Sequence, residues 1–252
     1  MALDHKRNII FTDLHAVNMV NSQGAVVVIA GGTHPGRSDG ILKPLFNHPC
    51  GLALDRTGNI YVADSKNHRI RKINKDSKVT TITGISGPGH QDGPTKTAQF
   101  NTPKGIAIDK KGIIYVADSK NDCIRRIDLA TSSVTTIPEA NSGYKFKNPR
   151  SLVVDNEDNV IVANTGNHNI LKISPEGVVS HVAGDGTPGY LDGRPEACKF
   201  NTPTSVAIDI NGNYIVADKK NNCLRVIHVC SKFIDIVNMV LNDAIGQVGT
   251  QC

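Results

Sequence analysis

The sequence predicts an all-β fold: a β-propeller built from four-stranded antiparallel blades, with about five repeats. The first observation is a phrase, Gly58-Asn59-Ile60-Tyr61-Val62-Ala63-Asp64, that recurs along the chain. Its last residue recurs at intervals of 51, 54, 46 and 54 residues, as Asp13, Asp64, Asp118, Asn164 and Asp218. Self-similarity at a period of roughly 40–50 residues is typical of propellers and solenoids.

The second observation is the strand pattern inside one unit. In residues 47–100, short apolar runs at 49–54, 60–63, 68–73 and 79–83 alternate with turn signals. In the first of these turns Asp55 is placed to hydrogen-bond its own backbone, and Gly58 is free to adopt positive φ. Strands of four to six residues with such close turns predict an antiparallel meander.

The third observation is a gradient of polarity across the unit. The first two strands are apolar at nearly every position, which predicts that both of their faces are covered. The third strand carries Arg69, Arg71 and Lys72 among isoleucines, so we expect it to be partly solvated. A dry inner edge and a wet outer edge are expected of a propeller blade that runs from the axis to the rim.

Glycine-rich segments at 31–40, 84–93 and 184–193 connect the units. The stretch that follows each of them ends in Phe-Asn before the next unit, and we expect Phe46, Phe100 and Phe200 to fill the gaps between blades. The third unit lacks this segment and crosses through residues 138–144 instead. No glycine-rich segment has the Lys-Ser/Thr ending of a phosphate-binding loop, so we interpret them as connectors.

The repeats divide the chain into a single domain, 1–252, with blades at about 1–46, 47–100, 101–147, 148–200 and 201–252. Two arrangements remain open: a five-bladed propeller, or an incomplete six-bladed ring. Residues 1–4 align with 51–55, so the chain is expected to begin inside an inner strand, as a fragment or a descendant of a longer array would.

Composition restricts function only weakly. The chain has 39% hydrophobic residues and a formal charge of +5, which permits an acidic protein or nucleic-acid partner without requiring one. No apolar leader segment and no stretch of about 20 apolar residues is present, so we expect a cytoplasmic protein without a membrane span. The oligomeric state stays open.

The repeated unit resembles the NHL-repeat family. Its pattern, Asn-x-Pro-x-Gly-Ile-Ala-Ile-Asp followed by Gly-Asn-Ile-Tyr-Val-Ala-Asp-x-x-Asn-x-Arg-Ile-Arg-Lys-Ile, is matched at 47–73, 101–127 and 201–227, and at 148–173 with Asn164 in place of Asp. The resemblance implies a propeller, typically six-bladed in that family. It also implies three classes of function: protein binding, binding of single-stranded RNA through a basic face, and metal-dependent lyase or hydrolase activity.

Polar and basic side chains are expected to gather on one face. Successive turns of a meander alternate sides, so the turns after the second strands and the glycine-rich crossings (with His34, Arg37 and His90) share a face. The polar pattern Asp64-x-x-Asn67-x-Arg69 is expected to brace its turn, whereas positions that vary between blades are candidates for partner contact. The predicted binding face comprises Lys66, Asn67, His68, Arg69, Lys120, Asn121, Asn167, His168, Lys219, Lys220 and Asn221.

The sequence shows no catalytic residues, metal ligands or cofactor motif. The residues expected to surround the axial mouth are His48, Thr102, Asn148 and Thr202, and one histidine does not make a His-rich zinc site or a carboxylate-lined calcium site.

RNA binding usually needs aromatic stacking platforms, and the chain has no Trp and only 4% aromatic residues. Tyr144 and Tyr190 are the exposed-loop candidates. We therefore expect a non-catalytic scaffold that binds a protein partner, with RNA binding and metal-dependent catalysis as the alternatives.

Overall fold

The computed structural model describes residues 1–138, 143–229 and 234–239. It contains five antiparallel sheets, and we call them blades 1 to 5. Blade 1 holds β1 (Ala2–Leu3), β2 (Ile9–Asp13), β3 (Ala16–Val20) and β4 (Val26–Gly31). Blade 2 holds β5 (Pro49–Leu54), β6 (Ile60–Asp64), β7 (Arg69–Ile73) and β8 (Val79–Thr83).

Blade 3 holds β10 (Pro103–Ile108), β11 (Ile114–Asp118), β12 (Cys123–Asp128) and β13 (Ser133–Thr136), with β9 (Gly93–Pro94) of the preceding crossing added at its outer edge. Blade 4 holds β14 (Ser151–Val154), β15 (Val160–Asn164), β16 (Asn169–Ile173) and β17 (Val179–Ala183). Blade 5 holds β18 (Pro203–Ile208), β19 (Tyr214–Asp218), β20 (Cys223–Val229) and β21 (Ile234–Met239). The predicted four-stranded antiparallel blades are confirmed.

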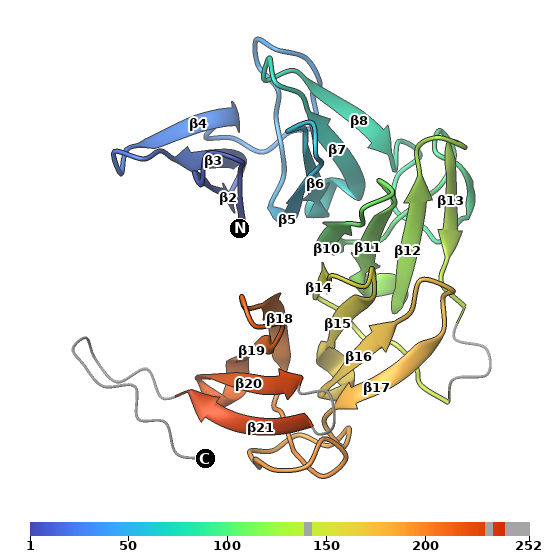
Figure 1. Ribbon diagram of the computed structural model, residues 1–252. Helices are drawn as coiled ribbons and strands as arrows, with labels where there is room; N and C mark the ends of the chain where they lie inside the picture. Colours follow the sequence, from blue (N-terminus) through green and yellow to red (C-terminus); the bar gives the residue numbers. More distant parts are fainter. Residues whose placement is uncertain (139–142, 230–233, 240–252) are drawn as a thin grey trace.

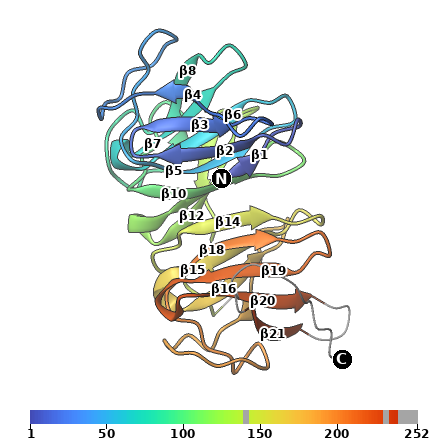
Figure 2. The ribbon, with the colours of Figure 1, turned by 90° about the vertical axis from the view of Figure 1, so that its left-hand side faces the viewer.

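The blades follow one another in chain order around a common axis (Figure 1). Their first strands lie innermost, and β5–β10, β10–β14 and β14–β18 are in contact with each other. In Figure 1 the ribbons of blades 1 and 5 are separated, and in Figure 2 strands β10 and β14 are visible between them. The fold is therefore a five-bladed propeller in which the described strands of the first and last blades stand apart.

The inner strands approach so closely that glycine is needed at the contact. A Cβ on Gly51 would lie 2.4 Å from the Lys104 carbonyl oxygen, and one on Gly105 would lie 2.9 Å from the Arg150 carbonyl oxygen. Distances this short leave no room for a side chain. These two glycines set the spacing of blades 2, 3 and 4 at the axis.

The hydrophobic core lies between the blades rather than within them. The three phenylalanines fill the gaps between blades, as predicted. Each side chain is fully buried, and each belongs to a different cluster that joins two adjacent blades: Phe46, Phe100 and Phe200. All five residues of β6, β11 and β15 are buried. Both faces of these strands are covered, as their unbroken apolar sequences predict.

Blade 1 has an apolar face that no other blade covers within the described part of the chain. Val26 occupies the place in β4 that Val79 occupies in β8, since each pairs with the last residue of the neighbouring strand. Val79 is fully buried against the preceding blade, whereas Val26 is 64% exposed. Leu3, Ile9 and Val28 are exposed as well.

The third strand of blade 2 is partly solvated at Arg69 and Lys72, as expected, but Arg71 is not. Arg71 has no exposed surface. Its guanidinium donates to the Asp64 and Asp39 carboxylates at 2.7 and 2.6 Å and to the backbone carbonyls of Ser38 and Leu45. The bracing arginine is therefore Arg71, two residues beyond Arg69, and it ties the glycine-rich crossing to the blade.

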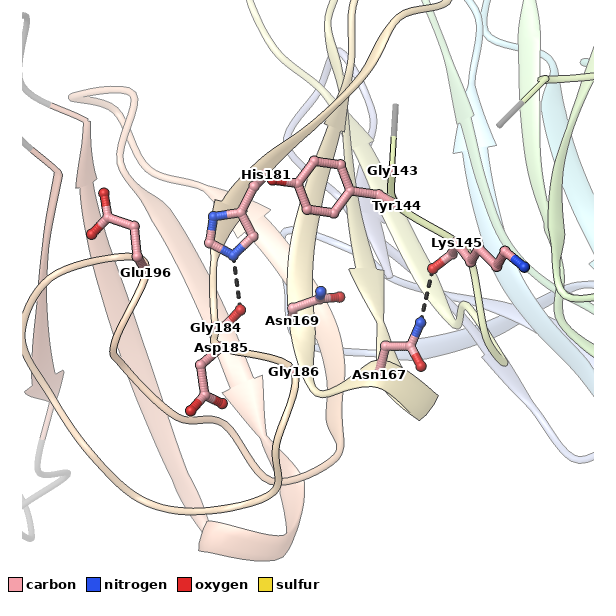
Figure 3. A pocket seen from close by; sticks show the side chains of 10 residues that line it. All are labelled: Gly143, Tyr144, Lys145, Asn167, Asn169, His181, Gly184, Asp185, Gly186 and Glu196. Atoms are coloured by element: carbon pink, nitrogen blue, oxygen red, sulfur yellow. Dashed lines mark hydrogen bonds between the residues drawn. The ribbon is translucent and has the colours of Figure 1, made fainter. Parts of the chain in front are cut away.

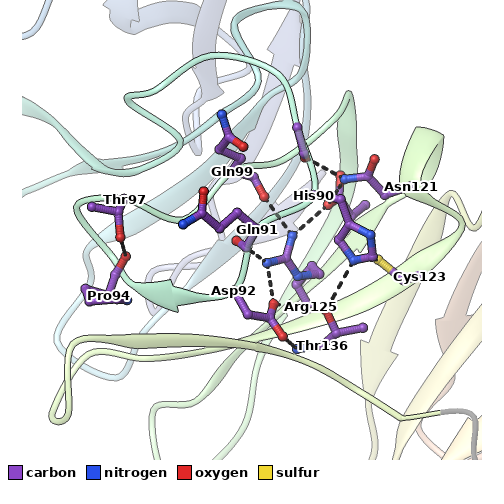
Figure 4. A network of polar contacts seen from close by, with 12 residues as sticks. His90, Gln91, Asp92, Pro94, Thr97, Gln99, Asn121, Cys123, Arg125 and Thr136 are labelled. Carbon is purple, nitrogen blue, oxygen red and sulfur yellow. Dashed lines mark hydrogen bonds and ion pairs between the residues drawn. The ribbon is translucent and has the colours of Figure 1, made fainter.

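The same network recurs in blade 3 (Figure 4). Arg125 donates to Asp118, to Asp92 and to the carbonyls of Gln91 and Gln99. Asp92 in turn accepts hydrogen bonds from the backbone N–H and hydroxyl of Thr136. In blade 5, Arg225 forms the matching contacts with Asp218 and Asp192.

Blade 4 replaces this network with uncharged groups. Asn164 stands in place of the buried aspartate, and Leu171 stands in place of the arginine, because it pairs with Val162 as Arg71 pairs with Val62. The Asn164 side chain donates to the Lys145 carbonyl and to Asn169 Oδ1. The two charges of the network are therefore lost together, in the blade whose preceding crossing lacks the glycine-rich segment.

Within the described part of the chain, no helix is long and apolar enough to cross a membrane.

Candidate binding face

Four short 3₁₀ helices form the turns between second and third strands on one face of the propeller, which we call the turn face. They are η1 (Ser65–Asn67), η2 (Ser119–Asn121), η3 (Thr165–Asn167) and η4 (Lys219–Asn221). The sequence pattern predicts plain turns at these places, whereas the structure has one turn of 3₁₀ helix at each. The predicted lysines Lys66, Lys120, Lys219 and Lys220 all lie on these helices and are exposed.

The side chains of the predicted asparagines of the turn face form hydrogen bonds within the protein. The Asn67 side-chain amide donates to the Asp64 carboxylate at 2.8 Å and to the Gly36 carbonyl of the crossing. Equivalent pairs of bonds are made by Asn121 and Asn221. Asn167 donates to the Lys145 carbonyl. These residues brace the turns, as the recurring pattern predicted for Asn67.

In blades 2 and 4 the residue after the 3₁₀ helix reaches across to the next blade. Nδ1 of His68 accepts a hydrogen bond from the backbone N–H of Thr102, and Nδ1 of His168 accepts one from Thr202, both at 3.0 Å. These positions vary between blades and were candidates for partner contact. The structure instead uses His68 and His168 as joints between blades.

The hydrogen bond that Nδ1 accepts fixes the tautomer of both imidazole rings. An Nδ1 that accepts an N–H carries no proton, so the neutral imidazole holds its proton on Nε2. Burial, together with the nearby Lys120 ammonium, lowers the pKa of His68. Burial and Lys220 lower the pKa of His168, with Lys147 adding to the effect and Asp218 opposing it.

The four predicted residues of the axial mouth share one backbone conformation. His48, Thr102, Asn148 and Thr202 have φ values of 48°, 57°, 45° and 62°. Their N–H groups donate to the preceding blade, to Leu14 O, His68 Nδ1, Asp122 Oδ1 and His168 Nδ1 respectively. They therefore form the seams between blades.

His48 has a histidine neighbour that the sequence analysis missed. The rings of His15 and His48 meet edge to face with centroids 5.1 Å apart. Among the described residues, no group of three or more His, Cys, Asp or Glu side chains could hold a metal ion. The axial mouth thus brings together two histidines, His15 and His48.

Two basic side chains nearer the axis were also missed. Lys104 and Arg150 follow the seam residues Thr102 and Asn148 by two positions, at the start of the inner strands. Burial, Arg150 and, more weakly, Lys120 and Lys219 lower the pKa of Lys104, while Cys50 opposes them.

A cavity of about 320 Å³ lies on the turn face of blade 2, and we call it the blade 2 pocket. Four predicted face residues line it, together with Arg37 and the start of the next crossing: Lys66, Asn67, His68, Arg69 and residues 85–88. Arg69 is half-buried there, and burial, Arg71 and Arg37 lower its pKa. No carboxylate is among the lining residues of this pocket.

A second cavity, of about 510 Å³, occupies the equivalent place in blade 4 (Figure 3). Its lining differs in charge, with Asp185 and Glu196 on one side and the stacked rings of Tyr144 and His181 above. The Lys145 side chain extends away from His181, and its carbonyl faces Asn167 (Figure 3).

Comparison with known proteins assigns the family. The family model described as NHL repeat matches residues 46–73 and 200–227. These segments run from the buried Phe46 and Phe200 through the inner strands, the 3₁₀ helix and the third strand. The chain is an NHL-repeat β-propeller. A second family model, the SMP-30/Gluconolactonase/LRE-like region, matches residues 87–188.

Relatives of this NHL propeller have varied names. It is 42% identical over 96 residues to Protein SUPPRESSOR OF QUENCHING 1, chloroplastic, of Arabidopsis thaliana, covering 37% of this chain and 9% of that protein. It is 34% identical over 129 residues to human NHL repeat-containing protein 2, covering 46% and 18%. It is 31% identical over 121 residues to the probable peptidyl-alpha-hydroxyglycine alpha-amidating lyase pgal-1 of Caenorhabditis elegans, covering 46% and 34%. The matched part of the chain thus spans between 9% and 34% of the length of these curated relatives.

Among solved structures, a streptogramin B lyase superposes with a TM-score of 0.66 at 14% identity, covering 96% of this chain and 68% of that one. At this identity the similarity shows the fold alone.

Proposed function

We propose that this NHL propeller is a non-catalytic binding module and that its turn face docks an acidic segment of a protein partner. The support is electrostatic. The exposed lysines of η1, η2 and η4 project from this face, and Lys104 and Arg150 add positive charge towards the axis.

One observation carries the proposal: the aspartate that directly precedes each of these three helices is already paired inside the fold. Asp64, Asp118 and Asp218 are fully buried and paired with arginines. Among the described residues, Lys66, Lys120, Lys219 and Lys220 form no salt bridge. Their charge is therefore free to attract an acidic partner, which raises the association rate and favours the matching orientation.

The two candidate aromatic platforms for RNA are engaged inside the protein. The Tyr144 ring stacks on the His181 ring. The Tyr190 ring lies against the Arg225 guanidinium, whose Cζ is 5.1 Å from the ring centroid. One face of each ring is thus covered, which reduces the stacking surface that a base could use. This favours a protein partner over single-stranded RNA.

The test uses two probes, a fluorescent peptide of ten glutamates and a ten-nucleotide single-stranded RNA. The variant Lys66→Glu/Lys120→Glu/Lys220→Glu reverses three charges of the turn face. The matched control, Lys75→Glu/Lys78→Glu/Lys111→Glu, makes the same change on exposed lysines of the opposite turns.

We expect the wild type and the control to bind the peptide, and the turn-face variant to lose binding. Binding should weaken as salt is added, because exposed charges are screened. Equal binding by both variants would remove the face assignment. Tighter binding of the RNA than of the peptide would favour the nucleic-acid alternative.

A further inference from the structure

The repeats of this propeller provide an internal control for which residues the fold needs. Arg69 pairs with Asp64 across the turn, and the equivalent positions in blades 3, 4 and 5 hold Cys123, Asn169 and Cys223. The fold therefore does not require arginine at this position. In blade 2 alone among these four blades it is a cation.

Arg37 departs from the repeat in the same way. It follows Gly36, whose carbonyl accepts a hydrogen bond from the Asn67 side chain. The equivalent glycines before blades 3 and 5 accept the same hydrogen bond from the equivalent asparagines, and they are Gly89 and Gly189. The residues after those glycines are His90 and Tyr190. Two arginines that the repeat does not demand thus line one cavity, the blade 2 pocket.

The titratable side chains of this pocket are all hydrogen-bond donors. Arg37, Lys66 and Arg69 are cations without acceptor atoms. Nδ1 of His68 is taken by Thr102, which leaves the Nε2–H as its remaining polar group. A ligand that satisfies these groups must supply acceptors, so it is an oxyanion.

The local charge balance indicates which oxyanion. Arg37, Lys66 and Arg69 contribute three positive charges. The adjoining network of Arg71 with Asp39 and Asp64 contributes one net negative charge. A carboxylate would leave the pocket positive, whereas a phosphoryl group carries about −1.5 to −2 at neutral pH and three acceptor oxygens.

We propose that the blade 2 pocket binds a phosphoryl group carried on a side chain of the partner, held by the guanidinium groups of Arg37 and Arg69. This inference rests on the proposed function, since it makes the pocket the anchor point of the acidic segment on the turn face. The cavity of about 320 Å³ leaves room beside the phosphoryl group for the side chain that carries it.

The experiment titrates ¹⁵N-labelled protein with inorganic phosphate and with three five-residue peptides, Gly-Gly-X-Gly-Gly, in which X is phosphoserine, glutamate or serine. The variant Arg37→Tyr/Arg69→Asn introduces the residues that blades 5 and 4 use, so the fold tolerates them elsewhere. Arg56→Gln, an exposed arginine on the opposite face, is the matched control. The unfolding midpoint of each variant verifies folding.

We expect phosphate and the phosphoserine peptide to shift the amide signals of Lys66, Arg69 and Ser86 saturably. The double variant should bind the phosphoserine peptide roughly tenfold more weakly or worse, because two charge-assisted contacts are lost. The Arg56→Gln control should bind like the wild type.

Equal affinity for the glutamate and phosphoserine peptides would overturn the phosphoryl assignment, and so would unchanged binding by the double variant. Shifts located only at Lys104 and Arg150 would move the anion to the axis and also reject the pocket. The double variant leaves Lys66, Lys120 and Lys220 intact. Loss of phosphopeptide recognition with retained binding of the ten-glutamate peptide would therefore separate failure of this pocket from failure of the proposed face.

Discussion

The guanidinium of Arg125 and the carboxylate of Asp118 meet at 3.0 Å with both side chains fully buried. The same arginine donates to Asp92 in the glycine-rich crossing, so one cation links the second strand, the third strand and the connection between blades. The ring of Phe100 lies against the same guanidinium, with 4.8 Å from its carbon to the centroid. A buried charge needs this degree of compensation to be tolerated.

Replacing Arg125 with Leu should therefore destabilise the propeller strongly. The change leaves the Asp118 carboxylate buried without its cation, and removal of one partner of a buried pair costs about 3–5 kcal/mol. Chemical denaturation measures the loss as a change in the free energy of unfolding.

Blade 4 provides the control, because Asn164 and Leu171 remove both charges together. The double variant Asp118→Asn/Arg125→Leu should be more stable than Arg125→Leu alone. Equal stability of the single and double variants would mean that the pair is not the source of the loss.

Stability should also depend on pH through the joints at His68 and His168. Both pKa values are lowered in the folded state, so the unfolded chain binds more protons and acid favours unfolding. The contribution is complete above the unfolded pKa of about 6.5 and is lost as the pH falls through the lower folded values.

The variant His68→Asn/His168→Asn keeps an acceptor near the position of Nδ1 but does not titrate. Its free energy of unfolding should fall less than that of the wild type between about pH 7.5 and about pH 5.5. Parallel profiles for the two proteins would show that these histidines are not responsible.

The uncovered face of blade 1 predicts different costs for matched valines. Val79→Ala removes fully buried apolar surface and should cost about 2 kcal/mol. Val26→Ala, at the equivalent but exposed place, should change the free energy of unfolding by less than about 0.5 kcal/mol. A cost for Val26→Ala as large as that for Val79→Ala would show that another surface covers blade 1 in solution.

Much of the architecture could be predicted because it depends on local patterns that repeat. The alternation of short apolar runs and turns predicted the strands of blade 2 nearly to the residue, and the Phe-Asn ends of the crossings predicted the fillers between blades. The 3₁₀ helices were missed, since one short turn of helix has no apolar period to reveal it.

The candidate site was predicted less well, and Arg69 and Arg71 show why. The two residues are similar in sequence, yet Arg71 is fully buried in an ion-pair network while Arg69 lines an open pocket. The two residues are two positions apart on β7 and so lie on the same side of the strand, and only the crossing that supplies Asp39 decides which of them is buried. His68 and His168 were likewise assigned to partner contact. The backbone N–H groups that donate to their rings belong to Thr102 and Thr202 of the following blade, which a local pattern does not reveal.

The sequence by itself determined the repeat, the strand order and the family, because each blade is a local unit whose apolar pattern and turn residues lie within about 50 contiguous residues. Only the tertiary structure decided which polar groups are hydrogen-bonded or paired inside the fold and which remain available to a ligand. That outcome depends on contacts between residues 26 to 34 positions apart, such as Arg71 with Asp39 and His68 with Thr102, which no local pattern records. The cations that line the blade 2 pocket, Arg37, Lys66 and Arg69, can be told apart from the paired Arg71 only once those contacts are known.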